Sequence, residues 1–335
     1  MSRRTGGFPP RDRVSHAPPH RRGRGAGIAS HLAAACLSAA MACVSAPPAG
    51  GPRPAGSTPP AAAVTPAPSS TVPLGSAQGS FTFAVIGDNG TGDAKQYETA
   101  RQLFAAYQRQ AFPIVIMVGD NIYGSERPQD FVKKFEEPYR ALLDGGVKFY
   151  ASLGNHDSRE QRYYKPYNME GKLYYSLKAP EQDVRFFALD STYLDKPQVE
   201  WLEKELSGSK EGWKIPFFHH PPYSSGGRHG SDLRLRAEVE PLFLQHGVTV
   251  VFTGHDHFYE RTKPQQGITY FVTGSGGKLA PGDLRNNSPM MARGFDTDQA
   301  FMVVNIDGDR LTFQAISRNG AVIDSGAIER RKQGE

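Results

Sequence analysis

Short apolar runs that stop at a glycine and a polar residue recur along this sequence, and they constrain its fold more than any other feature. Four of them are 81–86 before Asp88, 113–118 before Asp120, 147–153 before Asn155 and 248–253 before His255. Runs of this length that are rich in β-branched and aromatic residues are typical of buried strands. Because ligands bind at the carboxyl ends of strands in open α/β sheets, we expect these polar residues to meet at one edge.

Segments with helical spacing separate these strands, and the pattern changes after residue 267. The expected helices are 95–109, 129–143, 197–206 and 232–245, and two further strands are 184–189 and 215–218. Only strands follow, at 268–273, 300–306, 310–316 and 321–328, with hairpin turn signals at Asp307-Gly308 and Asn319-Gly320. Alternation of strands with helices predicts an α/β fold.

Composition divides the chain near residue 80. Residues 1–79 are dominated by Ala, Pro, Gly, Ser and Arg, and contain only Phe8 and Ile28 among Phe, Trp, Tyr and Ile. Such a stretch cannot bury enough apolar surface to offset the entropy of ordering it. We therefore predict a leader segment at 1–45, a Pro/Ala-rich disordered linker at 46–79 and one catalytic domain at 80–330.

The formal net charge of +5 comes from the leader and linker. Residues 1–79 hold eight Arg and one acid, whereas residues 80–335 hold 31 basic and 33 acidic residues. The expected domain is therefore slightly acidic and lacks the basic surface of a nucleic-acid-binding protein. We expect no nucleic-acid partner.

The N-terminus resembles an export signal. A region rich in arginine precedes a weakly apolar run at 26–44 that ends in small residues. Ala40-Met41-Ala42-Cys43 loosely matches a bacterial lipobox, although an ordinary cleavage site explains the small residues equally well. We expect an exported protein that is periplasmic, secreted or an outer-membrane lipoprotein attached through Cys43. The domain has no cysteine, and so it forms no internal disulfide.

The polar residues that follow the strands are all oxygen or imidazole donors. In order they are Asp88, Asp120, Tyr123, Asn155, His156, His220, His255 and His257. Alternate residues of an extended segment point the same way, and so His255 and His257 can face one centre. Two neutral imidazoles bound to a metal avoid the repulsion of two buried cations. The donor set suits iron, zinc or manganese.

The motifs that contain these residues, taken in order, resemble those of calcineurin-like metallophosphoesterases. They are Asp88-Asn89-Gly90, Gly119-Asp120-Asn121-Ile122-Tyr123, Gly154-Asn155-His156-Asp157, the His220 element and Gly254-His255-Asp256-His257. Gly90 stands where most of that superfamily has histidine, and Tyr123 is gained. This exchange is similar to that of the small, single-domain, tartrate-resistant purple acid phosphatases. The resemblance spans about residues 80–330 and implies two central mixed β-sheets flanked by helices.

The resemblance implies a site with two metal ions. Asp88, Tyr123 and His257 would hold Fe(III), and Asp120 would bridge to the second ion. Asn155, His220 and His255 would hold a divalent ion such as Fe, Zn or Mn. Either histidine of the pair His219-His220 could be the ligand, and His220 is preferred because the family places proline two residues after its ligand.

The implied reaction is hydrolysis of a phosphate monoester by a metal-bound hydroxide. His156 would contact the phosphoryl oxygens or the leaving group. His229 lies nine residues after His220, as a second catalytic histidine does in the family, and is predicted as a general acid. Asp157 is predicted to orient these groups.

The substrate is expected to be a small phosphate ester or a phosphoprotein. Two alternatives stay open at this point. One is a phosphodiesterase or nucleotidase of the same superfamily, and the other is a non-catalytic surface lipoprotein that keeps the fold for binding.

Overall fold

A computed structural model describes residues 72–75, 79–179 and 182–331. The predicted leader at 1–45 and most of the predicted linker at 46–79 lie outside these residues. Within the described ranges, every helix is too short or too polar to cross a membrane.

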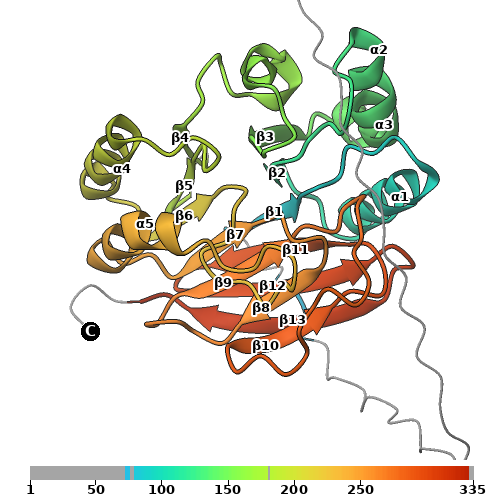
Figure 1. Cartoon of the computed structure of the whole chain (residues 1–335). Helices are drawn as coiled ribbons and strands as arrows, with labels where there is room; N and C mark the ends of the chain where they lie inside the picture. The colour runs from blue at the N-terminus through green and yellow to red at the C-terminus, as the bar shows by residue number, and fades with distance from the viewer. Residues whose placement is uncertain (1–71, 76–78, 180–181, 332–335) are drawn as a thin grey trace, which may run out of the picture. The chain divides into compact units, whose positions relative to one another are not determined.

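Two mixed β-sheets form the centre of the molecule (Figure 1). The first has the order β13-β12-β11-β1-β2-β3, with β1 Phe81–Ile86, β2 Ile114–Val118, β3 Lys148–Ser152, β11 Ala300–Asp307, β12 Arg310–Ser317 and β13 Val322–Glu329. The second has the order β10-β8-β9-β7-β6-β5-β4, with β4 Tyr175–Lys178, β5 Val184–Ala188, β6 Trp213–Phe217, β7 Val250–Thr253, β8 Tyr259–Thr262, β9 Thr269–Thr273 and β10 Met291–Phe295.

Parallel strands form one half of the first sheet and the middle of the second. β1, β2 and β3 pair in parallel in the first sheet, and β5, β6, β7 and β9 do so in the second. The remaining pairs are antiparallel, including the β11–β12 and β12–β13 hairpins. The prediction of two mixed sheets flanked by helices is therefore confirmed.

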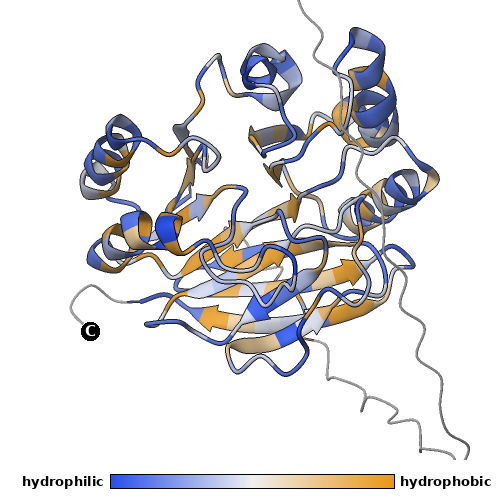
Figure 2. Cartoon of the chain, in the orientation of Figure 1, coloured by the Kyte–Doolittle hydropathy of each residue, from blue (hydrophilic) through white to orange (hydrophobic). Residues whose placement is uncertain are grey.

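The two sheets pack face to face through aromatic side chains. The ring of Phe83 on β1 lies 5.0 Å from that of Phe186 on β5 and 6.0 Å from that of Phe252 on β7, measured between centroids. Phe271 on β9 meets Phe313 on β12 at 5.0 Å. Offset and edge-on aromatic pairs of this kind add stability beyond their buried area. Figure 2 shows the apolar residues concentrated on the strands.

Helices cover the outer face of each sheet. On the first sheet lie α1 Ala94–Arg109, α2 Pro128–Phe131, a π-helical turn at Val132–Glu136 and α3 Glu137–Asp144. On the second lie α4 Lys196–Gly208 and α5 Leu233–Gln245, whose apolar residues form a separate cluster with β5, β7 and β9. Asp93, Asp195 and Asp232 cap α1, α4 and α5, each accepting a backbone N–H of the first turn.

The structure differs from the sequence-based expectation at three strands and one helix. β4, β8 and β10 were not predicted, because each is four or five residues long and carries charged or polar side chains. The segment 129–143 is helical, with a π-helical turn between α2 and α3. Residues 72–75, within the range predicted as linker, hydrogen-bond to the first sheet, where Gln314 Nε2 donates to the carbonyl of Val72 at 2.9 Å.

Candidate metal centre

The candidate ligands follow the carboxyl ends of parallel strands from both sheets. Asp88 follows β1, Asp120 follows β2 and Asn155 follows β3, while His219-His220 follow β6 and His255 follows β7. The two sheets thus contribute to one site, as the strand-end pattern predicted.

The backbone at three of these residues adopts a conformation that L-residues rarely occupy. Asp88, Asp120 and His255 have φ of +53°, +52° and +72°. Non-glycine residues in this left-handed region store strain, and such strain clusters at functional sites. Each of the three residues thus stands in a sharp turn directly after its strand.

Two glycines allow the carboxylates to approach the neighbouring loops. A Cβ atom at Gly154 would overlap the carboxylate of Asp120, and one at Gly254 would overlap that of Asp88. Only glycine fits at these close approaches. Gly154 before Asn155 and Gly254 before His255 are therefore required for steric reasons.

The first group of donors contains Asp88, Asp120, Tyr123 and His257. Ligand atoms of Asp88, Asp120 and His257 lie within 4.8 Å of one another. The Tyr123 hydroxyl donates to Asp88 Oδ1 at 3.0 Å and lies 3.1 Å from His257 Nε2. Two carboxylates, a phenol and an imidazole therefore converge, and hard anionic donors of this kind suit a highly charged ion.

Gly90 leaves room for this arrangement. A Cβ at residue 90 would overlap the backbone carbonyl of Asn121, and so no side chain fits there. The carbonyl of Gly90 instead accepts the backbone N–H of Tyr123 at 2.9 Å. The loop after β1 therefore packs directly against the backbone of the loop that carries Tyr123.

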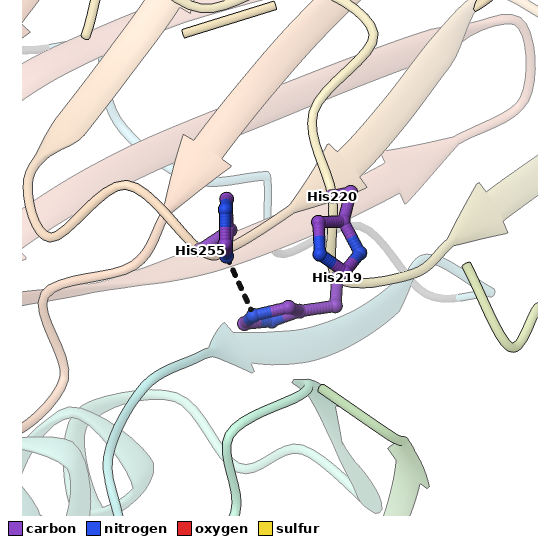
Figure 3. A group of neighbouring side chains, drawn as sticks. All are labelled: His219, His220 and His255. Carbon is purple, nitrogen blue, oxygen red and sulfur yellow. Dashed lines mark hydrogen bonds between the residues drawn. The ribbon is translucent and has the colours of Figure 1, made fainter. Parts of the chain in front are cut away.

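The second group contains Asn155 and three histidines, His219, His220 and His255, whose ring nitrogens lie within 4.8 Å of one another. His219 Nε2 lies 3.0 Å from Asn155 Oδ1, 3.1 Å from His255 Nδ1 and 3.4 Å from Asp120 Oδ1. Figure 3 shows the imidazole of His219 directed at that of His255. Asp120 thus adjoins both groups, as a bridging carboxylate must.

The geometry favours His219 over the predicted His220 as the ligand of this group. His219 Nδ1 lies 3.0 Å from the carbonyl of Val118 and donates its proton there, so the lone pair of Nε2 faces the cluster. His220 Nδ1 instead lies 3.0 Å from Ser191 Oγ. The proline pattern could not separate the two histidines, because Pro221 follows His219 at the same spacing at which Pro222 follows His220.

The electrostatics of the groups fit a bound cation. Burial and the neighbouring Asp120 raise the pKa of Asp88, and burial with Asp88 and Asp120 raises the pKa of the Tyr123 phenol. Burial and the nearby His219 lower the pKa of His255 to about 2, so this imidazole is neutral. A cation would reverse the shifts of the acids, since it stabilises carboxylate and phenolate. Neutral imidazoles are the form that ligates.

Asp157 holds the loops of the site together. Its carboxylate accepts the backbone N–H groups of Gly154, Asn121 and Ile122 at 2.9 to 3.0 Å, and the side-chain amides of Asn121 and Gln161 at 3.1 and 2.8 Å. It therefore links the loop after β2, which carries Asp120 and Tyr123, to the loop after β3. Asp157 is therefore a structural link between the two loops that carry ligands, and we call it the clamp.

Two exposed histidines stand at the rim of the centre. The ring of His156 lies 5.0 Å from that of Tyr123, and the ring of His229 lies 4.3 Å from that of His255. The backbone N–H of His156 also donates to Asp120 Oδ1 at 3.0 Å. The structure thus brings both predicted histidines to the centre, one beside each group of donors.

Buried carboxylates on the last motif fix the loop that carries His229. Asp256 accepts the hydroxyl of Ser224, while Glu260 on β8 accepts the hydroxyl and the backbone N–H of Ser225, the latter at 2.7 Å. Sequence reasoning missed this contact, because more than 30 residues separate each serine from its carboxylate.

Lys278 is a further residue that sequence reasoning missed. Its ammonium group lies 4.6 Å from the centre of the Tyr123 ring, and its backbone N–H donates to the carbonyl of Asp88 at 2.9 Å. A cation over this ring favours negative charge on the phenol oxygen. In the sequence, the only indication that Lys278 lies near the site was its position directly after the Gly274–Gly277 turn.

Two adjoining groups of nitrogen and oxygen donors, at the strand ends of the two sheets, define the class of protein, a hydrolase with a two-metal site. The sequence pattern of calcineurin-like phosphoesterases matches residues 81–259, which is more than half of the chain. The chain therefore belongs to the calcineurin-like phosphoesterase family.

The chain is similar to acid phosphatases in sequence and to a further solved structure in fold. Human tartrate-resistant acid phosphatase type 5 is 22% identical over 301 residues, which cover 74% of this chain and 91% of the relative. The Fe(3+)-Zn(2+) purple acid phosphatase 12 of Arabidopsis thaliana is 29% identical over 217 residues, covering 57% and 45%. The structure of GAP50, an anchor in the inner membrane complex of Plasmodium, has a TM-score of 0.65 at 19% identity, covering 77% and 91%, and shows a shared fold.

Proposed function

We propose that this protein is an acid phosphatase of the purple type, which hydrolyses phosphate monoesters with an Fe(III) ion and a divalent ion. The observation that carries the proposal is the position of Tyr123. Its hydroxyl lies within 3.1 Å of both Asp88 Oδ1 and His257 Nε2, and the backbone around Gly90 leaves no room for a side chain at that position. The purple and tartrate-resistant acid phosphatases among its relatives support the same reading.

The donors divide between the two ions by their chemistry. Asp88, Tyr123 and His257 suit Fe(III), while Asn155, His219 and His255 suit Fe, Zn or Mn in the divalent state, with Asp120 between them. When bound, such a pair lowers the pKa of water and offsets the negative charge of the phosphoryl group. Strained loops and close glycines hold the ligands in place before the substrate arrives.

The rim histidines act on the substrate itself. We assign His156, beside Tyr123, to the phosphoryl oxygens. His229, beside His255, donates a proton to the leaving oxygen. The contacts of Ser224 and Ser225 with buried carboxylates keep its loop in place.

The leaving group tests the role of His229. Replacing His229 with alanine should slow the hydrolysis of alkyl phosphates by about 100-fold, the lower end of the typical contribution of a general acid. It should slow 4-nitrophenyl phosphate far less, since 4-nitrophenolate leaves without a proton. The measurement is kcat on both substrates. Equal losses on the two would contradict proton donation.

The visible absorption spectrum tests the assignment of Fe(III) to the group that contains Tyr123. An Fe(III) phenolate absorbs visible light, and so the purified full-length protein loaded with iron and zinc should be coloured and should hydrolyse 4-nitrophenyl phosphate. The Tyr123→Phe variant should lose the visible band and bind iron about 100-fold more weakly, at the upper end of the cost of losing a metal-supporting group.

Three results would contradict parts of this proposal. A colourless, iron-free and active wild type would exclude the purple type. Faster hydrolysis of bis(4-nitrophenyl) phosphate than of the monoester would favour a phosphodiesterase. Absence of bound metal and of activity would favour a non-catalytic surface protein.

We also propose that the protein is exported, with Cys43 either lipidated or removed by signal cleavage. The arginine-rich region and the apolar run at 26–44 support export. Palmitate labelling of cells separates the two routes, because a lipoprotein would incorporate label that Cys43→Ser abolishes.

A further inference from the structure

A cavity of about 460 Å³ lies beside the second group of metal donors. Six of its lining residues matter here: Arg159, Ser191, Tyr193, His220, Asp232 and Arg234. We call it the flank cavity. It combines residues that follow β3, β5 and β6 with the first turn of α5, and so it shares the sheet edge that carries the metal centre.

His220 stands between the flank cavity and the metal centre. Its ring lies 4.4 Å from the ring of His255 and 5.0 Å from that of His219. The hydroxyl of Ser191 fixes it from the other side, at 3.0 Å from both its Nδ1 and its backbone N. The flank cavity and the second group of metal donors are therefore separated by the width of one imidazole ring.

Two guanidinium groups face this space. Arg159 lies with its Cζ 5.1 Å from the centre of the exposed Tyr193 ring, and its side chain is about half exposed. Its Nε reaches the buried Asp190 only at 3.6 Å, beyond a hydrogen bond, so most of its donors are free for a ligand. Arg234 is exposed in the first turn of α5, where the helix dipole disfavours a cation.

The carboxylates of the lining do not cancel these charges. Asp232 and Asp195 cap α5 and α4, and each directs Oδ1 to a backbone N–H at 2.9 and 3.0 Å. The partial positive charge of each helix N-terminus offsets its capping carboxylate. Arg159 shares its charge with Asp190 at 3.6 Å, whereas Arg234 has no carboxylate within ion-pair distance among the described residues. The planar donors of both arginines match the geometry of a carboxylate or a phosphate.

We propose that the flank cavity binds the leaving group and selects phosphate monoesters whose leaving group carries a second anionic group. Arg159 and Arg234 bind this second anion, and Tyr193 contacts the body of the leaving group. The inference rests on the proposed phosphatase function and adds a substrate class to it.

Two matched substrates test the selectivity. Phenyl phosphate and 4-carboxyphenyl phosphate differ only in the second anion. The metal-loaded full-length enzyme should show a higher kcat/KM on the carboxylated ester, with the difference mainly in KM. Arg159→Ala and Arg234→Ala should each reduce that preference by about tenfold, the value of one hydrogen bond to a charged group.

The control is Arg140→Ala, which removes an exposed arginine of α3 outside the cavity lining. It should leave the preference as in the wild type. Equal losses on both substrates in the two cavity variants would overturn the proposal, and so would a wild-type preference for 4-(aminomethyl)phenyl phosphate, which carries a cation instead.

A binding measurement separates this inference from the proposed function. Calorimetric titration with phenylphosphonate and 4-carboxyphenylphosphonate needs no catalysis. Tighter binding of the carboxylated compound, lost in Arg159→Ala/Arg234→Ala, would support the cavity even if hydrolysis failed. Equal binding of both compounds by the wild type would overturn it, whatever the activity on phenyl phosphate.

Discussion

His219→Ala is expected to release the divalent ion and to lower kcat/KM on phosphate monoesters by more than about 100-fold, beyond the cost of losing a group that only supports a ligand. The reason is geometric. His219 Nε2 faces Asn155, His255 and Asp120 within 3.4 Å, whereas His220 Nδ1 lies against Ser191. The measurement is metal content by plasma mass spectrometry after dialysis, together with steady-state kinetics.

His220→Ala is the matched variant, because it removes an adjacent imidazole. It should keep both ions per chain. If His220→Ala loses the divalent ion and His219→Ala retains it, the assignment is reversed and the choice made from the sequence was correct. Loss of the ion in both variants would show that the metal uses both rings, which the 4.8 Å grouping of His219, His220 and His255 also permits.

The second large effect is expected at Asp157, on stability. Asp157→Ala would remove the acceptor of three backbone N–H groups. The side-chain amides of Asn121 and Gln161 would each lose one acceptor and keep another, the carbonyl of Ser152 and the carboxylate of Glu126. Unsatisfied buried donors cost about 1–3 kcal/mol each, and water entering the space would satisfy some of them. We expect a loss of about 3 kcal/mol in the free energy of unfolding, which lowers the Tm of a domain of this size by about 6–12 °C.

Thermal unfolding of the metal-free protein measures this effect without contributions from bound ions. Glu160→Ala, an exposed acid three residues away, is the control and should change Tm little. Metal affinity should fall with Asp157→Ala as well, because the clamp positions Asp120 and Tyr123. Unchanged stability together with lost activity would instead indicate that Asp157 mainly orients the reacting groups, as predicted from the sequence.

The sequence by itself determined the strand and helix pattern and the identity of the donors. Short runs rich in apolar and β-branched residues, such as 81–86 and 113–118, indicate strands buried on both faces, and each run is followed by a glycine and a polar residue. The rule that ligands gather at the carboxyl ends of parallel strands then placed Asp88, Asp120, Asn155 and His255 together before any coordinates were known. The local sequence was sufficient to predict these elements because hydrophobic periodicity and turn-forming residues are local properties of the chain.

Only the tertiary structure decided between neighbouring residues and assembled the contacts from distant segments. His219 and His220 have the same chemistry and nearly the same sequence context, and the carbonyl of Val118, about 100 residues earlier, orients one of them toward the metals. The clamp at Asp157, the carboxylates behind Ser224 and Ser225, and the flank cavity likewise join segments far apart in the chain. Such contacts depend on how two sheets pack, and no periodicity along a single chain encodes that packing.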